Sequence, residues 1–303
     1  MKGTTVDTSV HPVCLRPADG MDLSTGNIYF TTHDTSGAHV FRTGQTSSPG
    51  QEVKLYSESP GSQFGDITWA KVGDVYYGYF WAASEGNSFI KRILLTGSET
   101  ATVLTPPIND IDIVNSYHNL ATDGVSLYWQ SAQSVSKMPI GGGPITTLDL
   151  TRPNTPTAGV YLNGRILFYA DVADLRYVPA DGSAVTPPWL RTIVTADTGV
   201  TTILPVSDGV YWGDRTGAIR VKVGTTISTI VPAGGTIPTS IGTNGYTAGG
   251  ALIWTLSGSQ GSDVGYDYPG GQGSFAAGAD AHGASMNSAG NGFWRDVNGV
   301  YRF

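Results

Sequence analysis

Short runs of apolar and β-branched residues, separated by turn residues, recur along the whole chain. The clearest example is the segment 118–150, where strands are expected at 118–122, 125–129, 135–139 and 145–150. Asp123-Gly124 and a triple glycine at 141–143 separate two pairs of these runs. Such alternating or β-branched runs, bounded by turn residues, are typical of antiparallel strands joined by tight turns. The segment is therefore predicted to form a four-stranded meander.

An aromatic residue ends the second strand of this meander, and an aromatic residue is found in the equivalent place throughout the chain. The set is Phe30, Trp81, Trp129, Tyr169, Trp212, Trp254 and Trp294. Neighbouring members are separated by about 40 to 50 residues, a period that is typical of β-propellers with four strands per blade. The sequence therefore predicts an all-β fold, namely a single seven-bladed β-propeller with four-stranded antiparallel blades. Large rings at one depth in every blade fill the space between stacked sheets, so these residues are expected in the core rather than at a ligand.

The blade boundaries follow from this repeat. The predicted blades cover 20–56, 66–104, 118–150, 157–194, 202–231, 245–279 and 284–303. The last of them holds only three strands, so the N-terminal segment 4–15 is expected to supply its outer strand and close the ring. The Gly-, Ser- and Asp-rich stretch 255–290 is either a loop or a set of weakly patterned strands, and we favour strands with long turns.

Composition supports a turn-rich fold and excludes two classes of partner. The chain has 41 Gly and 17 Pro, and only 14% of its residues are charged, so long charged helical faces are not expected. The net charge is −7 and the basic residues are scattered, which argues against a nucleic-acid surface. No apolar run reaches the ~18 residues that a membrane span needs.

Cysteine usage and overall composition bear on redox chemistry and location. The single cysteine, Cys14, has no partner for an internal disulfide and is expected to be a small buried apolar residue rather than a catalytic thiol. Few lysines and abundant Gly, Ser and Thr resemble the composition of secreted bacterial proteins. A secreted or extracytoplasmic location is therefore expected, in which case Met1 takes the place of a signal peptide that has been removed.

Two segments resemble a known repeat. ATDGVSLYW, at 121–129, followed by VSKMPIGGGPITTL, at 135–148, resembles a repeat of large bacterial proteins, many of them myxobacterial, and is similar to the YWTD repeats of lipoprotein-receptor propellers. VSDGVYWGDRTGAIRVKVG, at 206–224, matches part of that pattern. The resemblance implies a propeller fold and no particular activity. Lactone-opening lyases and metal-dependent lactonases share this architecture, but their catalytic spacing does not occur in the sequence.

The candidate site lies at the mouth of the expected central channel. In propellers, the loops that lead into the innermost strand share one face with the loops that join the second and third strands, and such loops on a rigid scaffold carry function. The first group of loops offers Asp19, Gln63, Asp66, Tyr117, His118, Asn119, Asn154, Asn244, Tyr246, Asp280 and His282. The second group offers His33, Asp34, Glu85, Asp171, Asp174, Asp214, Arg215 and Asp296.

Some of these residues are predicted to bind a ligand, and others have a simpler explanation. The predicted ligand-binding residues are Asp66, Tyr117, His118, Asn119, Tyr246, Asp280 and His282. Asp171, Asp214 and Asp296 are better explained as turn formers, and His33 as a solvated turn residue. No zinc spacing, phosphate-binding glycine loop or nucleophile elbow is found, so no metal site is predicted and the cofactor is left open.

Three functions fit these features. The first is an extracellular recognition protein that binds a saccharide or another polar ligand at the channel mouth; because the loops differ among blades, one asymmetric site is expected rather than one sugar site per blade. The second is a lyase or hydrolase with His118 or His282 as general base and Tyr117 in support. The third is a protein-docking scaffold. The expected partner is accordingly a small polar ligand, a saccharide or a protein.

Overall fold

The computed structural model describes the chain as strands and their turns. The described residues are 11–13, 27–34, 36–44, 53–84, 87–96, 100–108, 120–131, 134–150, 160–163, 166–171, 174–183, 192–195, 199–234, 236–243, 249–258, 261–268, 271–277, 282–286, 292–296 and 299–302. Every regular element among them is a β-strand, so the prediction of an all-β fold is confirmed.

The strands form separate antiparallel sheets that follow one another along the chain. The first sheet holds β1 (His11–Val13), β2 (Asn27–Asp34), β3 (Gly37–Gly44) and β4 (Val53–Glu58), and the second holds β5 (Gln63–Val72), β6 (Val75–Ser84), β7 (Asn87–Leu94) and β8 (Thr102–Val103). The third holds β9 (Leu120–Thr122), β10 (Ser126–Gln130), β11 (Ser134–Pro139) and β12 (Thr146–Leu150). The fourth holds β13 (Val160–Asn163), β14 (Ile166–Asp171), β15 (Asp174–Pro179) and β16 (Thr192–Thr195).

The second half of the chain repeats this plan. The fifth sheet holds β17 (Val200–Val206), β18 (Gly209–Asp214), β19 (Ile219–Val223) and β20 (Thr226–Val231). The sixth holds β21 (Ile237–Thr243), β22 (Leu252–Gly258), β23 (Gly261–Tyr268) and β24 (Gly271–Ala277). The last sheet has three strands in the described part of the chain: β25 (His282–Met286), β26 (Gly292–Asp296) and β27 (Gly299–Arg302).

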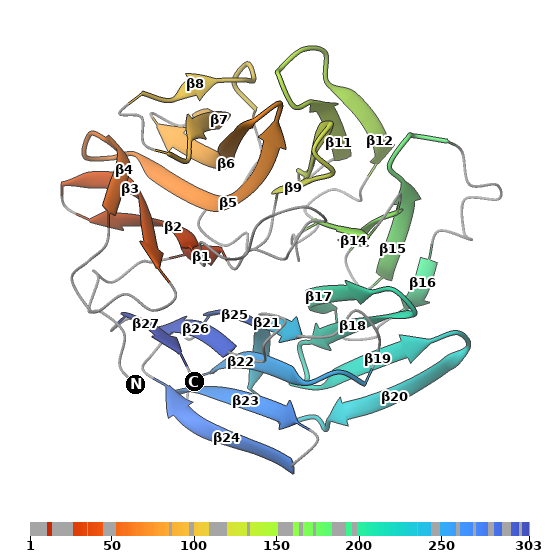
Figure 1. The fold of residues 1–303 in the computed structure, drawn as a ribbon. Coiled ribbons are helices and arrows are strands. Elements are labelled where there is room, and N and C mark those ends of the chain that lie inside the picture. The colour runs from red at the N-terminus through yellow and green to blue at the C-terminus, as the bar shows by residue number, and fades with distance from the viewer. Residues whose placement is uncertain are drawn as a thin grey trace.

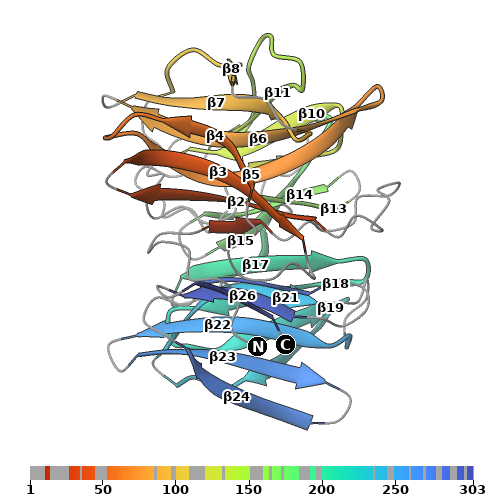
Figure 2. The same ribbon diagram turned by 60° about the vertical axis from the view of Figure 1, so that its left-hand side comes forward.

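These sheets are arranged like the blades of a propeller. Within each sheet the strands are paired in chain order, and the first strand lies toward the middle of the molecule (Figure 1). The first strands contact one another in succession from β1 through β5, β9, β13, β17 and β21 to β25, and β25 in turn contacts β1. The view turned by 60° shows the sheets stacked face to face (Figure 2). Stacking of this kind buries both faces of sheets that could not be stable alone.

The N-terminal segment does not take the place that the sequence predicts. β1 pairs with β2, with His11 opposite Thr31 and Val13 opposite Tyr29, so it belongs to the first sheet and not to the last. The prediction that 4–15 forms the outer strand of the last blade is therefore wrong for the described residues 11–13. The physical reason is that β2 has a second edge to satisfy besides the one paired with β3, and β1 covers it. The start of the predicted first blade, 20–26, lies outside the described residues.

The sixth sheet also begins earlier than the sequence suggests. Its first strand is β21, at Ile237–Thr243, whereas the pattern placed the start of the blade near Gly245. β21 contains Pro238, a residue that argues against a strand, and its pairing with β22 shifts register between Pro238 and Ser240. The alternation of apolar and polar residues that marks a strand is therefore weak in this segment. Farther along, the turn-rich stretch after Trp254 forms paired strands, β23 and β24, as the sequence analysis favoured.

The core lies between neighbouring sheets and contains the recurring aromatic residues. Trp81, Trp129, Tyr169 and Trp212 are each exposed by 2% or less, and Trp254 is also buried. Trp81 in the second sheet and Trp129 in the third meet edge to face, with ring centroids 6.3 Å apart. The prediction that these side chains are core residues is confirmed for the five described here, which explains the repeat by packing alone.

A close contact in the sixth sheet gives a test of this packing. Gly265 of β23 lies opposite Trp254 of β22, and a Cβ atom at Gly265 would come within 2.2 Å of the indole ring. We expect Gly265→Ala to lower the free energy of unfolding by about 1–3 kcal/mol, because the buried ring must leave its position. Urea denaturation measures this, with Gly141→Ala as the control, since nothing lies within 4 Å of a Cβ atom at Gly141. Equal losses in the two variants would contradict the packing of Trp254 on Gly265.

Candidate functional site

The structure describes only two of the seven residues that were predicted to bind a ligand. Asp66 lies within β5, at a register shift between Phe64 and Ile67, and His282 is the first residue of β25, opposite Arg295. Tyr117, His118, Asn119, Tyr246 and Asp280 lie outside the described residues. A common binding site for these seven residues is therefore still a prediction.

Asp214, a carboxylate of the second group of loops, builds a turn. Asp214 ends β18 with its side chain fully buried; Oδ1 accepts a 2.9 Å hydrogen bond from the backbone N–H of Thr216 and a second one from the Thr216 hydroxyl. The guanidinium of Arg220, on β19, donates to Oδ2. The interpretation of Asp214 as a turn former is confirmed. Arg220 was not among the residues predicted from the sequence, although its charge, six residues from an aspartate, was a usable signal.

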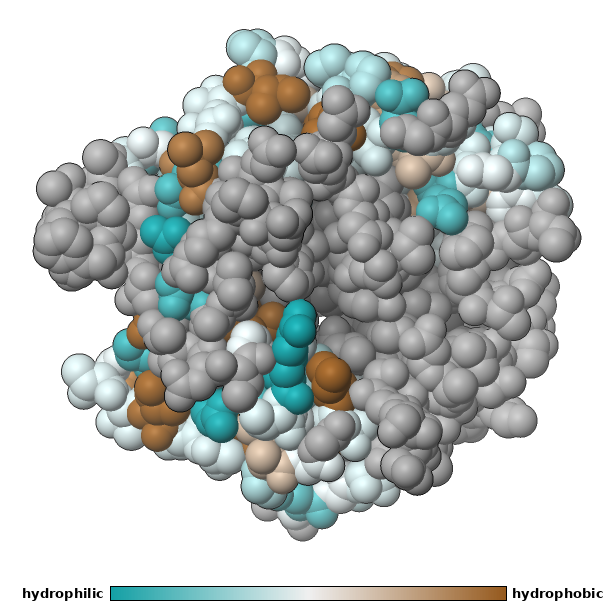
Figure 3. Space-filling model, turned by 180° about the vertical axis from the view of Figure 1, so that it is seen from behind, coloured by the Kyte–Doolittle hydropathy of each residue, from teal (hydrophilic) through white to brown (hydrophobic). Residues whose placement is uncertain are grey.

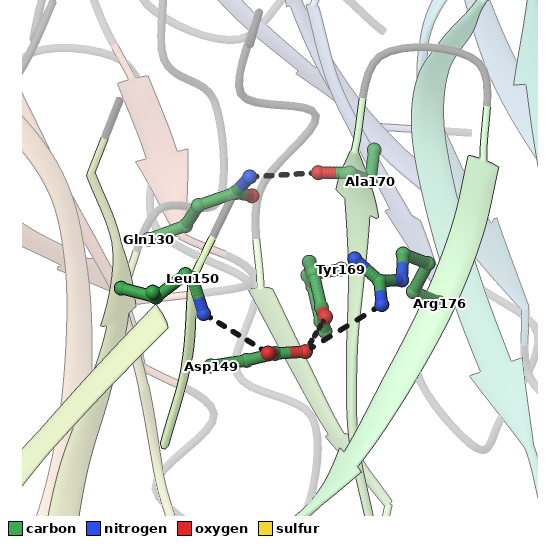
Figure 4. A network of polar contacts seen from close by, with 6 residues as sticks. All are labelled: Gln130, Asp149, Leu150, Tyr169, Ala170 and Arg176. Atoms are coloured by element: carbon green, nitrogen blue, oxygen red, sulfur yellow. Dashed lines mark hydrogen bonds and ion pairs between the residues drawn. The ribbon is translucent and has the colours of Figure 1, made fainter. Parts of the chain in front are cut away.

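A second polar network joins the third and fourth sheets (Figure 4). Asp149 of β12 accepts a hydrogen bond from the hydroxyl of Tyr169, and its Oδ2 lies 3.9 Å from Nη2 of Arg176. Above these residues, the side-chain amide of Gln130 donates a 2.7 Å hydrogen bond to the carbonyl oxygen of Ala170. Every one of these contacts crosses from one sheet to the next. The two contacts of Asp149 hold the outer strand β12 against the fourth sheet.

The next residue after Asp149 points away from this network. Oδ1 of Asp149 accepts a 2.9 Å hydrogen bond from the backbone N–H of Leu150, while the Leu150 side chain is 72% exposed. An anchored outer strand thus ends in an exposed apolar side chain. Burial of the Leu150 side chain against a partner would remove its apolar surface from water, which favours binding.

The first and second sheets are joined in a related way. Nζ of Lys91, on β7, donates to Oε1 of Glu58 at the end of β4, and both side chains are largely buried. The hydroxyl of Tyr56 donates to the same oxygen at 2.6 Å. Burial, followed by the hydrogen bond to Glu58 and its charge, raises the pKa of the Tyr56 hydroxyl above its usual range. Tyr56 therefore stays neutral and donates a hydrogen bond, so it is a structural residue rather than a proton acceptor.

His39, a histidine outside the predicted site, is buried in the first sheet. His39 of β3 is 5% exposed, and its two ring nitrogens lie 3.0 Å from the hydroxyl oxygens of Ser36 and Ser57. Its ring meets Phe41 edge to face at 5.9 Å. These contacts tie the turn before β3 to β4. Nothing in the sequence pattern distinguishes this histidine, because Ser57 becomes its neighbour only when β3 pairs with β4.

The described part of the chain contains neither a cluster of metal-binding side chains nor a membrane-spanning helix. Among the residues that the structure describes, no three His, Cys, Asp or Glu side chains gather in a way that could hold a metal ion. In those same ranges there is no helix with the length and apolar character to cross a membrane.

Exposed apolar side chains are found on the outer strands. Leu150 on β12 is 72% exposed, Val103 on β8 52%, Ile227 on β20 47% and Val53 on β4 45%. On the face seen in Figure 3, the coloured hydrophobic side chains form small groups among hydrophilic ones. Among the described residues, the outer strands therefore present separate apolar side chains to solvent rather than one large patch.

Comparison with solved structures agrees with the propeller-like arrangement. A chain of the mitotic checkpoint complex is similar to this chain with a TM-score of 0.67 and 10% identity, over 100% of this chain and 95% of that one. The WD40 β-propeller domain of Doa1 has a TM-score of 0.62 and 10% identity, over 99% and 93% of the two chains. PorZ, a surface component of the type-IX secretion system of Porphyromonas gingivalis, has a TM-score of 0.62 and 11% identity, and the match spans 37% of its length.

Sequence comparison does not assign this chain to a protein family. No protein-family model matches the chain, and no curated protein matches it. The similarity of 121–129 to YWTD repeats therefore has no support beyond the residues that carry it. At 10–11% identity, the solved structures show the fold of this chain and nothing of its activity.

Proposed function

We propose that this protein is a docking scaffold that binds other proteins through the outer strands of its sheets. The observation that carries the proposal is the exposure of Leu150, Val103 and Val53 on three different outer strands. Two of those strands, β12 and β4, are tied to the neighbouring sheet through Asp149 and Glu58. Apolar side chains on a rigid support lose little conformational entropy on binding, which favours association.

The propeller-like neighbours are consistent with this role. One of them is part of the mitotic checkpoint complex, an assembly of proteins. We further propose that the seven sheets are blades of one closed ring, which is supported by the contact of β25 with β1. A closed ring would hold all the outer strands at fixed positions around one body.

The proposal is tested by co-purification from the native source, followed by identification of the recovered proteins. Leu150→Glu, Val103→Glu and Val53→Glu are prepared separately, because each alters one outer strand. The matched control is Val125→Glu: Val125 is 71% exposed, as Leu150 is, but lies in the turn before β10 and not on an outer strand. At least one outer-strand variant is expected to lose a partner that both the wild-type protein and the control retain, by about 10-fold or more for one buried apolar anchor.

Two results would contradict the docking role. The first is that all variants recover the same proteins as the wild type. The second is that a glycan array identifies a saccharide ligand whose binding is unaffected by the outer-strand changes. That outcome would favour the first function expected from the sequence, saccharide binding at the channel mouth by a secreted protein, for which Tyr117 and His118 are the proposed contacts.

A further inference from the structure

We infer that Ser36, His39 and Ser57 form a nucleophilic site at which Ser36 accepts an acyl group from a small carboxylic ester. The site uses none of the exposed apolar side chains of the proposed scaffold role, so the inference does not rest on that role. Nε2 of His39 lies 3.0 Å from Oγ of Ser36, and Nδ1 lies 3.0 Å from Oγ of Ser57. A serine hydroxyl at one ring nitrogen, with a third group at the other, is the arrangement that activates serine in acyl transfer.

The protons of this arrangement require one serine to donate to the ring. A neutral imidazole has one nitrogen that carries a proton and one that can only accept a hydrogen bond. Both ring nitrogens of His39 contact a hydroxyl, so the N–H donates to one serine and the other nitrogen accepts from the second serine. A hydroxyl that donates to a ring nitrogen is in position to transfer its proton when its oxygen attacks. Either tautomer of neutral His39 therefore has one serine placed as a nucleophile.

The strands assign different roles to the two serines. Ser57 is on β4 directly opposite His39 of β3, so strand pairing fixes its position relative to the ring. Ser36 lies in the turn before β3, at the end of the sheet rather than within a strand. Ser57 is thus the residue that orients the ring by accepting from Nδ1–H, and Ser36 is the nucleophile whose proton Nε2 accepts.

Burial separates the base from the nucleophile. His39 is 5% exposed, and its ring meets Phe41 edge to face, whereas Ser36 and Ser57 are both exposed. Packing and two hydrogen bonds hold the ring in one orientation, which lowers the entropy cost of aligning the base with the attacking oxygen. An ester in solution can therefore reach the Ser36 hydroxyl while the base remains fixed beneath it.

Gly37 holds the turn close to β4. Its φ of 133° is in the region that favours glycine, and a Cβ atom at this position would lie 1.8 Å from the carbonyl oxygen of Glu58. The turn that carries Ser36 therefore packs on the backbone next to Ser57. This contact brings both serines to the same end of the first sheet, where one imidazole reaches them both.

The reaction balances without a cofactor or a further reagent. When Oγ of Ser36 bonds to the carbonyl carbon of the ester, its proton passes to Nε2 of His39. The bond from that carbon to the alcohol oxygen then breaks, and His39 returns the proton to the leaving oxygen. The products are an acyl ester on Ser36 and a free alcohol. Because Ser57 is a neutral hydroxyl rather than a carboxylate, it stabilises the imidazolium less, so slow acylation is expected rather than fast turnover.

The experiment is acetylation of the whole chain by p-nitrophenyl acetate, with peptide mass spectrometry to locate and time the modification. In the wild type, Ser36 is expected to gain an acetyl group faster than Ser134. Ser36→Ala should lose this modification, and His39→Gln should slow it by about 100-fold, as expected for loss of a general base. Ser134→Ala is the control and should leave the rate at Ser36 unchanged. Ser134 begins the third strand of the third sheet, and its hydroxyl contacts those of Ser131 and Ser136 rather than a ring nitrogen.

The role of the second serine is measured in the same way. Ser57→Ala should slow acetylation of Ser36 by about 10-fold, because the ring loses the group that orients it. Circular dichroism establishes that each variant is folded, and if His39→Gln is not, Ser57→Ala takes its place in the test. The inference is overturned if wild-type Ser36 reacts no faster than Ser134, if Ser57 carries the acetyl group instead, or if the folded variant reacts at the wild-type rate. None of these results depends on recovery of a partner protein, so this site can fail its test while the scaffold role stands.

Discussion

Replacement of Trp129 by alanine is expected to lower the free energy of unfolding by about 3–5 kcal/mol, among the largest effects of a single substitution in this protein. Trp129 is 2% exposed and lies between the second and third sheets. Its ring meets Trp81 at an interplanar angle of 82° and packs in one cluster with Leu127 and Met138. Alanine removes the ring from both sheets at once and leaves a cavity that rigid strands cannot close.

The measurement is urea denaturation followed by tryptophan fluorescence and circular dichroism. Val125→Ala is the control, because Val125 belongs to the same segment but is 71% exposed, and its truncation should change stability by less than about 0.5 kcal/mol. Trp129→Phe should have an intermediate effect, since it keeps part of the ring. A Trp129→Ala variant with the wild-type denaturation midpoint would show that this aromatic residue does not hold the two sheets together.

Asp214→Ala is the second substitution with a large expected effect, a loss of about 3 kcal/mol. The Asp214 side chain is fully buried and accepts hydrogen bonds from Thr216 and Arg220. Without it, the backbone N–H of Thr216 loses its acceptor, and Arg220, whose side chain is 31% exposed, is left without this carboxylate. The loss is expected to come from the missing acceptor of the Thr216 N–H and from the partly buried guanidinium of Arg220, which loses its counter-charge.

A double-mutant cycle separates these contributions. Arg220→Met alone should also destabilise the protein, because it leaves the buried carboxylate without its cation. Asp214→Ala combined with Arg220→Met is expected to cost less than the sum of the two single changes, with a coupling of about 1–3 kcal/mol. Thermal and urea denaturation of the four proteins give this coupling. Strict additivity would mean that the two side chains do not interact in solution.

Local patterns explain most of the elements that the sequence predicted. In the third sheet, the expected strand 125–129 corresponds to β10 at Ser126–Gln130, and the turn before it is built by Asp123. Oδ1 of Asp123 accepts hydrogen bonds of 2.8 Å from the N–H of Val125 and 2.6 Å from that of Ser126, and Gly124 has a φ of 83°. These interactions join residues within three positions of one another, so residue types alone can specify them.

The positions of the binding-site residues could not be predicted from local patterns in this way. Of the predicted contacts, Asp66 and His282 are placed on β5 and β25, and the others fall outside the described residues. The polar contacts that are described, such as Glu58 with Lys91, join residues 33 positions apart in different sheets. No local pattern marks such a pair, because which sheet edges meet depends on how whole blades stack.

The sequence by itself determined that this chain forms short antiparallel strands, with a buried aromatic residue in the five repeats where that side chain is described. Period-two alternation, turn chemistry and side-chain size act over a few residues, so a local pattern can specify them. Only the tertiary structure decided that β1 joins the first sheet, that β21 opens the sixth, and that Asp149 anchors β12 to its neighbour. Pairing between strands and contact between sheets involve residues far apart in the chain, and their outcome is set by the competition of all edges and faces for partners.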